Sequence, residues 1–184
     1  TADYLMNTFA FYRKWLKDAV LDQTEEGGIP HVVPDLLTGQ SSENWLVKEC
    51  PHSACAWADV ITIMPWNLYL NFGDKDVLAE NYDAMKAWVG FMERNSKDYI
   101  CNYKVQFGDW VALDAEEGSY FGATPNDLTC TAFFAYSTEL TGKIAKILGR
   151  EEDAAYYEAL YEKIKEAFQK QFFREDGTMT AQTQ

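Results

Sequence analysis

Two pairs of tryptophan and aspartate carry most of the chemistry that this sequence offers. Trp57 and Asp59 stand two residues apart in Ala-Trp-Ala-Asp, and Asp109 and Trp110 are adjacent in Phe-Gly-Asp-Trp. The flat ring of tryptophan stacks well on the apolar C–H face of a sugar. Tryptophans and carboxylates gathered on one concave surface are therefore typical of a carbohydrate site. We predict Trp57, Trp110, Asp59 and Asp109 as substrate-binding residues.

Each candidate also has a structural interpretation that the sequence leaves open. Asp59 could be a first-turn acid that complements the dipole of the following helix. Asp109 follows a glycine and could be a turn residue. Trp45, within Glu-Asn-Trp, is either a rim residue of the site or a loop anchor. The remaining tryptophans fall within helical patterns and are assigned to core packing: Trp15, Trp66 and Trp88.

The candidates lie in or beside two long loops, at 23–56 and 96–125. Each loop has about thirty residues, far more than the usual connection between packed elements, and loops of this length are usually functional. The connections that follow them, around Gly73 and Gly149, are only a few residues long. If the short turns lie on one face of a ring of helices, the long loops must meet on the other.

The hydrophobic periodicity predicts an all-α chain without persistent strand alternation. The predicted helices span 1–22, 58–72, 74–94, 126–148 and 151–173, and Pro65 should kink the second or mark where its regular part begins. A weak repeat with an offset of about 75 residues relates the two glycine-containing turns and the helices around them. We infer antiparallel helical hairpins that form a slice of a larger helical toroid.

Composition narrows the partners of the chain. Its 184 residues suffice for one domain with a real core, and 15% of them are aromatic, which argues against disorder. The net charge of −13 disfavours nucleic acid and anionic membrane surfaces, because phosphate binding needs a basic footprint. No apolar run approaches the roughly 18–20 residues of a membrane span. Localisation is left unassigned, since a fragment would not retain a signal peptide.

Metal and cofactor chemistry has little support in the sequence. Cys50, His52 and Cys55 invite a zinc interpretation, but they lack the paired C-x-x-C spacing and a clear fourth ligand, so free thiols are favoured and no metal is predicted. Cys130 sits in an apolar helical run and reads as a buried small residue. No phosphate-binding glycine loop or dinucleotide fingerprint occurs, and no cofactor is predicted. We interpret Glu116 and Glu117 as a solvated pair.

Several short motifs, in the same order along nearly the whole chain, resemble the catalytic domain of bacterial α-L-rhamnosidases, glycoside hydrolase family 78. They are Phe-Tyr-Arg-Lys-Trp-Leu at 11–16, Gly-Ile-Pro-His-Val-Val-Pro at 28–34, Ala-Trp-Ala-Asp at 56–59, Pro65-Trp66 with Tyr69, Gly-Asp-Trp at 108–110, Thr124-Pro125 and Thr183-Gln184. The resemblance implies an (α/α)6 barrel with a sugar pocket at one end. It also implies an inverting mechanism, in which an acid and a base stand roughly 6.5–9.5 Å apart to admit a water.

The resemblance places the principal catalytic carboxylates outside this chain. The family's general acid lies in an Arg-Asp-Glu-Arg segment, which by collinearity should precede Thr1, and its general base is a glutamate expected beyond Gln184. Residues 1–184 are accordingly expected to be an inactive fragment of a single catalytic domain. Trp57 and Trp110 occupy positions where the family lines its rhamnose pocket with aromatic residues. The partner implied is a rhamnoside, and cutting the barrel is expected to favour self-association through apolar flanks that include Phe9, Trp15, Phe168 and Phe172.

Two alternatives remain open at this point. One is another (α/α)6 carbohydrate enzyme with a different sugar specificity. The other is a non-catalytic helical-repeat binding scaffold, which would show regular short loops and a charged concave face. The long tryptophan-bearing loops argue against the scaffold.

Overall fold

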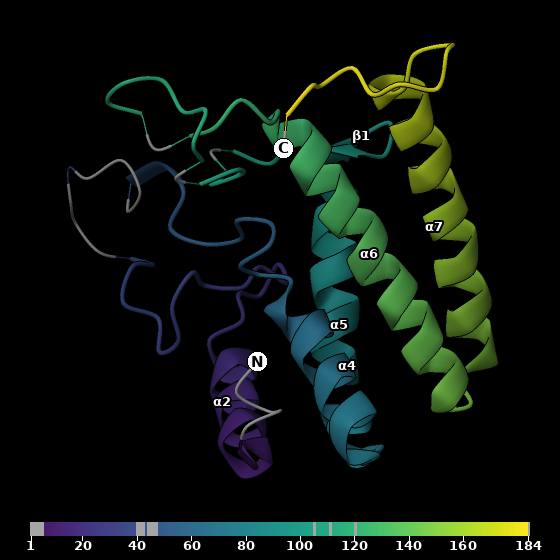
Figure 1. The fold of residues 1–184 in the computed structure, drawn as a ribbon. Helices are drawn as coiled ribbons and strands as arrows, with labels where there is room; N and C mark the ends of the chain where they lie inside the picture. Colours follow the sequence, from purple (N-terminus) through teal and green to yellow (C-terminus); the bar gives the residue numbers. More distant parts are fainter. Residues whose placement is uncertain are drawn as a thin grey trace.

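A computed structural model describes residues 6–39, 43, 48–104, 106–110, 112–119 and 121–183. Within them the chain folds into five α-helices and one short antiparallel hairpin, which confirms the all-α prediction (Figure 1). The helices are α2 (Phe9–Leu21), α4 (Val60–Phe72), α5 (Asp76–Arg94), α6 (Asn126–Ile147) and α7 (Glu151–Phe172). The hairpin pairs β1 (Ser96–Lys97) with β2 (Ile100–Cys101) inside the second long loop.

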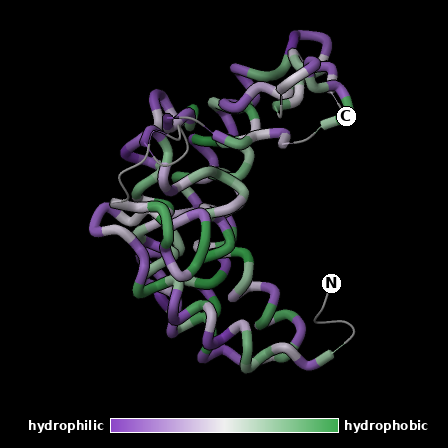
Figure 2. Tube along the Cα trace, turned by 90° about the vertical axis from the view of Figure 1, so that its left-hand side faces the viewer, coloured by the Kyte–Doolittle hydropathy of each residue, from purple (hydrophilic) through white to green (hydrophobic). Residues whose placement is uncertain are grey.

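The five helices pack against one another in a connected series. Helix α4 contacts α2, α5 and α6, and helix α6 contacts α4, α5 and α7. The sequence of α4 is apolar on nearly every side, as suits a helix with neighbours all around. Figure 2 shows apolar residues gathered within the helical body. The helices thus bury their apolar residues against one another.

Two glycine turns close the hairpins α4–α5 and α6–α7. Gly73 and Gly149 both have a φ of 70°, in the left-handed region that glycine adopts without a Cβ clash. The Gly73 N–H donates to the Tyr69 carbonyl at 2.8 Å, and the Arg150 N–H donates to the Ala145 carbonyl at 2.9 Å. Both turns lie at the lower end of the helices in Figure 1, whereas the two long loops lie at the upper end. The predicted alternation of short turns and long loops is confirmed.

The first helix starts eight residues later than predicted, and the second and third each start two residues later. The first helix begins at Phe9, because residues 6–8 are a bend and coil in which the Asn7 side chain accepts the Phe9 N–H at 3.2 Å. Residues 1–5 of that prediction lie outside the described part. The second helix begins at Val60, after turns at 55–59, and continues unbroken through the buried Pro65.

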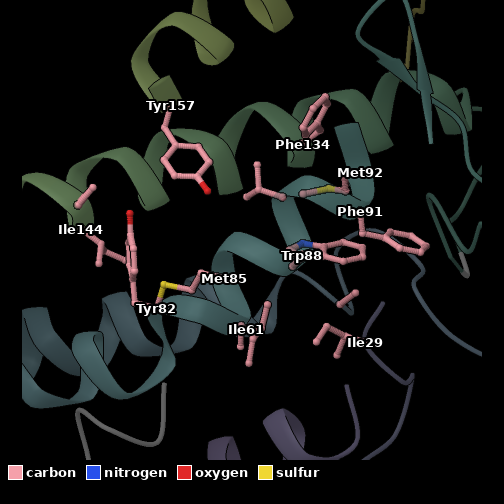
Figure 3. Packing of buried hydrophobic residues seen from close by; sticks show 14 of the residues in the cluster. Ile29, Ile61, Tyr82, Met85, Trp88, Phe91, Met92, Phe134, Ile144 and Tyr157 are labelled. Carbon is pink, nitrogen blue, oxygen red and sulfur yellow. The ribbon is translucent and has the colours of Figure 1, made fainter. Parts of the chain in front are cut away.

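The core lies where α4, α5, α6 and α7 meet (Figure 3). Helix α5 supplies its centre, with Trp88 fully buried and stacked on Phe91 at 5.6 Å between ring centroids. Trp15 and Trp66 pack against the same cluster, as predicted for the helical tryptophans. All four cysteines are buried free thiols, including Cys130 within α6.

Of the apolar flank residues named above, Phe9, Trp15 and Phe168 are partly exposed. Phe172 is buried. Phe9 packs edge-on against Phe72 of α4 at 5.1 Å, and Phe168 packs on Phe172 at 4.9 Å. On the same two helices, Phe11 is 66% exposed and Tyr156 is 50% exposed.

None of the described helices combines the length and apolar character that crossing a membrane requires.

Candidate functional site

An aromatic row joins the two long loops at the upper end of the helices. Its centre is Phe107, which is 7% exposed. The Trp57 ring meets one side of Phe107 edge-on at 4.7 Å between centroids, and the Trp110 ring meets it at 5.3 Å. The two tryptophans are 40% and 37% exposed, so each presents part of its ring to solvent. The structure therefore brings Trp57 and Trp110 onto one surface, with a buried phenylalanine between them.

The backbones of the two loops are joined beneath this row. The Cys55 N–H donates to the Gln106 side-chain oxygen at 2.7 Å, and the Gln106 amide nitrogen in turn donates to the Tyr103 carbonyl. Gln106 is completely buried, so these bonds are shielded from water. A side chain at 106 thus replaces the ladder that two strands would provide, and it fixes the segment before Trp57 against the segment before Trp110.

His31 supports the same phenylalanine from the first loop. Its ring lies 4.8 Å from the Phe107 ring, and its Nε2 donates to the Cys50 carbonyl at 2.7 Å. Because a carbonyl only accepts, Nε2 carries the hydrogen and Nδ1 is left as a buried acceptor without a hydrogen-bond partner. Burial lowers the pKa of His31 from its usual 6.5, which keeps the imidazole neutral.

Asp59 does not lie at the exposed aromatic surface. Its residue is 0% exposed, and its carboxylate accepts three hydrogen bonds. Oδ1 accepts from Trp88 Nε1 at 3.0 Å and from Ser137 Oγ at 2.5 Å, while Oδ2 accepts from the Ala56 N–H at 2.8 Å. Burial raises the pKa of Asp59, and the three donors act in the opposite direction. The geometry makes this aspartate an anchor between the first loop, α5 and α6.

Asp109 stays partly exposed beside Trp110. Its carboxylate accepts the Thr124 hydroxyl at 2.8 Å, and its backbone carbonyl accepts the Gly122 N–H at 2.7 Å. The Thr124 oxygen is also 2.9 Å from the Thr183 hydroxyl. A hollow of about 720 Å³ opens here, lined by Asp109, Ala112, Leu113, Asp114, Ala181, Gln182 and Thr183. A carboxylate at the edge of a hollow, next to a half-exposed tryptophan, is suited to accept hydrogen bonds from a polyol.

The base of the first loop is fixed tightly against helix α5. The Gln23 amide donates to the Ala84 carbonyl at 3.1 Å, and Arg94 donates to the Glu26 carbonyl at 2.6 Å. At Gly27, an added Cβ would lie 2.3 Å from the Ala87 carbonyl oxygen, so only glycine fits there. The loop that carries Trp57 therefore starts from a fixed base.

The sequence did not identify Phe107, Gln106 or His31 as parts of the site. Phe107 and His31 stood inside the motifs already singled out, at 107–110 and 28–34, but nothing in their spacing distinguished them. Trp45 lies outside the described residues. Glu116 and Glu117 are exposed. Among the described residues, no three His, Cys, Asp or Glu side chains form a group that could hold a metal ion.

Comparison with known proteins agrees with this architecture. The family model described as the bacterial alpha-L-rhamnosidase 6 hairpin glycosidase domain matches residues 1–184. The chain belongs to this family. An α-L-rhamnosidase of Formosa agariphila is 39% identical over 175 residues, which cover 95% of this chain and 18% of the relative. Only about a fifth of that curated relative is therefore represented here.

Solved structures give the same fold. The crystal structure of Streptomyces avermitilis α-L-rhamnosidase complexed with L-rhamnose matches 95% of this chain and 15% of its own, with a TM-score of 0.78 and 31% identity. The native Aspergillus terreus enzyme matches 96% of this chain and 20% of its own, with a TM-score of 0.82 and 30% identity. The helical hairpins are thus part of an (α/α)6 barrel.

Proposed function

We propose that this chain forms the sugar-binding middle of an inverting glycoside hydrolase that cleaves terminal α-L-rhamnose from glycosides or polysaccharides. The observation that supports this most is the aromatic row, in which Trp57 and Trp110 from the two long loops both pack edge-on against Phe107. L-Rhamnose, which is bound in the Streptomyces avermitilis structure, has a methyl group and C–H faces that such rings suit.

In the proposed binding, the two tryptophans of the row and the neighbouring Asp109 have different roles. The tryptophan rings exclude water from the apolar faces of the sugar, and Asp109 accepts a hydroxyl hydrogen from the direction of the hollow. Asp59 supports this surface from below and makes no contact with the sugar in the proposal, because its carboxylate is fully buried and already accepts three donors. Binding specificity then comes from the loops, and rigidity comes from the helices.

The proposed acid and base are contributed by other parts of the full-length enzyme. An inverting glycosidase needs one carboxylic acid that protonates the leaving oxygen and one carboxylate that activates water. Asp59 is inaccessible, and Asp109 is engaged with Thr124, so neither is assigned a proton-transfer step here. The 184-residue chain alone is accordingly expected to hydrolyse no aryl α-L-rhamnoside. Saturable hydrolysis by the pure chain would contradict this placement.

The site is tested by Trp57→Ala and Trp110→Ala in the full-length enzyme that contains this chain. Each change should lower kcat/KM for an aryl α-L-rhamnoside. The corresponding loss of transition-state stabilisation should be about 1–3 kcal/mol, the scale of one substantial apolar or stacking contact. Trp66→Phe is the control, because Trp66 packs against the core on α4. It should alter stability more than kcat/KM. Unchanged kinetics in both alanine variants would reject the pocket.

We further propose that the chain by itself associates through its apolar flanks, moderated by its charge of −13. The flank residues are Phe9 and Trp15 of α2 and Phe168 and Phe172 of α7, and Phe11 of α2 is 66% exposed. Light scattering over a concentration series should show a mass that rises with concentration. A strictly monomeric, cooperatively folding chain would contradict the proposal.

A further inference from the structure

The segment that carries Trp57 has a backbone that its own residues disfavour. Ser53 and Ala56 have φ values of 68° and 72°, in the left-handed region that residues with a Cβ rarely adopt. Ser53 lies four residues before Trp57 and Ala56 directly before it, and neither is glycine. A turn of this kind persists only where surrounding contacts hold it in place. The contacts that hold Ala56 therefore decide where the Trp57 ring lies.

The hydrogen bonds around Trp57 identify the contact that holds Ala56. The Ala56 N–H donates to Asp59 Oδ2 at 2.8 Å. The Ala58 N–H donates to the Ala54 carbonyl at 2.9 Å, which closes the turn on both sides of Trp57. Asp59 cannot move to follow a relaxing loop, because its other oxygen is bonded to Trp88 of α5 and Ser137 of α6.

The two carboxylate oxygens of Asp59 thus have separate tasks. Oδ1 receives both donors from the helices, and Oδ2 receives the donor from the loop. Asp59 itself is 0% exposed, so its carboxylate is shielded from water. A rigid helical body therefore acts on a single loop amide through one side chain.

We propose that Asp59 is a positioning residue: its buried carboxylate holds Ala56 in the left-handed conformation and thereby sets the Trp57 ring against Phe107 at the sugar-binding surface. The consequence for rhamnose binding rests on the function proposed above. The consequence for the position of the Trp57 ring does not.

The decisive variant is Asp59→Asn. Asparagine keeps one oxygen, which can still accept from Trp88 and Ser137, but it places an amide donor where Oδ2 met the Ala56 N–H. The matched control is Ser137→Ala, which removes a donor from Oδ1 and leaves the bond to Ala56 intact. The chain labelled with 5-fluorotryptophan gives ¹⁹F NMR signals, and Trp57→Phe identifies the one from Trp57.

In Asp59→Asn we expect the Trp57 signal to move or broaden while the Trp66 signal stays in place. Ser137→Ala should shift Trp88 and leave Trp57 unchanged. Adding Ala56→Gly to Asp59→Asn should return the Trp57 signal toward its original position, because glycine adopts the left-handed conformation without the carboxylate. If Asp59 only stabilised the core, adding Ala56→Gly would not restore the Trp57 signal. An unmoved Trp57 signal in Asp59→Asn, or an equal displacement in Ser137→Ala, would overturn the proposal.

A second route tests the same link if Asp59→Asn does not fold. Ala56→Val leaves the carboxylate in place but disfavours the left-handed conformation, so it should displace the Trp57 signal, whereas Ala56→Gly alone should not. An undisplaced Trp57 signal in Ala56→Val would overturn the proposal.

Titration with L-rhamnose separates this inference from the proposed function. Asp59→Asn should weaken binding about tenfold, and the Ala56→Gly double variant should recover most of it. If the parent chain and the full-length enzyme both fail to respond to L-rhamnose, the proposed function fails. The movement of the Trp57 signal still decides the role of Asp59 in that case.

Discussion

The segments 53–59 and 106–110 each place an aspartate beside a half-exposed tryptophan, yet they treat the two carboxylates in opposite ways. Asp59 is 0% exposed and accepts donors from the loop, α5 and α6. Asp109 is partly exposed, and the side-chain donor to its carboxylate is Thr124, beside a hollow. Asp59 immediately precedes the inner helix α4, so the core surrounds it, whereas Asp109 lies in the loop. The same pair of residue types therefore makes an anchor in one loop and an accessible group in the other.

The largest difference between the two aspartates should appear in stability. Asp59→Ala removes the acceptor of three hydrogen bonds, two of them fully buried, and we expect the free energy of unfolding to fall by about 3–5 kcal/mol. Asp109→Ala should cost about 1 kcal/mol or less, because its partners can reach water. Urea denaturation of both variants measures the difference. Equal losses would mean that burial does not distinguish the two carboxylates.

Phe107 and Trp110 of the aromatic row should likewise differ in how much they contribute to stability. Phe107 is nearly buried, so Phe107→Ala should lower the free energy of unfolding by about 3 kcal/mol. Trp110→Ala removes a ring that is 37% exposed and should cost about 1 kcal/mol. The same denaturation experiment tests both. A larger loss for Trp110 than for Phe107 would make Trp110 a core residue and would weaken its assignment to the sugar surface.

A smaller effect should follow from Thr124→Val, which removes the hydroxyl that lies 2.8 Å from the Asp109 carboxylate and nearly preserves the side-chain volume. Loss of one partly exposed hydrogen bond should cost about 1 kcal/mol. Leu113→Ala, at a position 99% exposed on the same loop, is the control and should be neutral within about 0.5 kcal/mol. If Thr124→Val matches that control, Asp109 is held by something other than this hydroxyl.

The most gradual effect concerns pH. Burial lowers the pKa of His31 below 6.5, so near that pH the unfolded chain binds more protons than the folded one. The stabilising contribution of neutral His31 is present above pH 6.5 and is lost as the pH falls through the folded pKa. The free energy of unfolding should therefore decrease less between pH 7.5 and 5.5 in His31→Gln than in the parent. An identical pH dependence in the two proteins would show that folding does not lower the pKa of His31.

The sequence predicts those parts of the fold and site that depend on residues close together in the chain. It does not predict those that depend on contacts between distant residues. Helix periodicity and the glycines at 73 and 149 are local signals, and they predicted the hairpins and the side on which the loops meet. The burial of Asp59 depends on donors 29 and 78 residues away, at Trp88 and Ser137, which no local pattern connects to it. The same applies to Gln106, whose partner Cys55 is 51 residues distant. The sequence motif at 28–34 marked His31 without indicating that it supports Phe107.

The fixed base of the first loop has a consequence for how this surface can diversify. Gly27 has the Ala87 backbone where a side chain would go, and Gly28 has Ser53 and His52 there, so neither position can vary freely. Only a few residues further on, Val32 and Leu36 are 44% and 66% exposed. Variation between related proteins should therefore concentrate at exposed positions such as Val32 and Leu36. A library restricted to those exposed positions should change the surface of the first loop while leaving the supporting helices untouched.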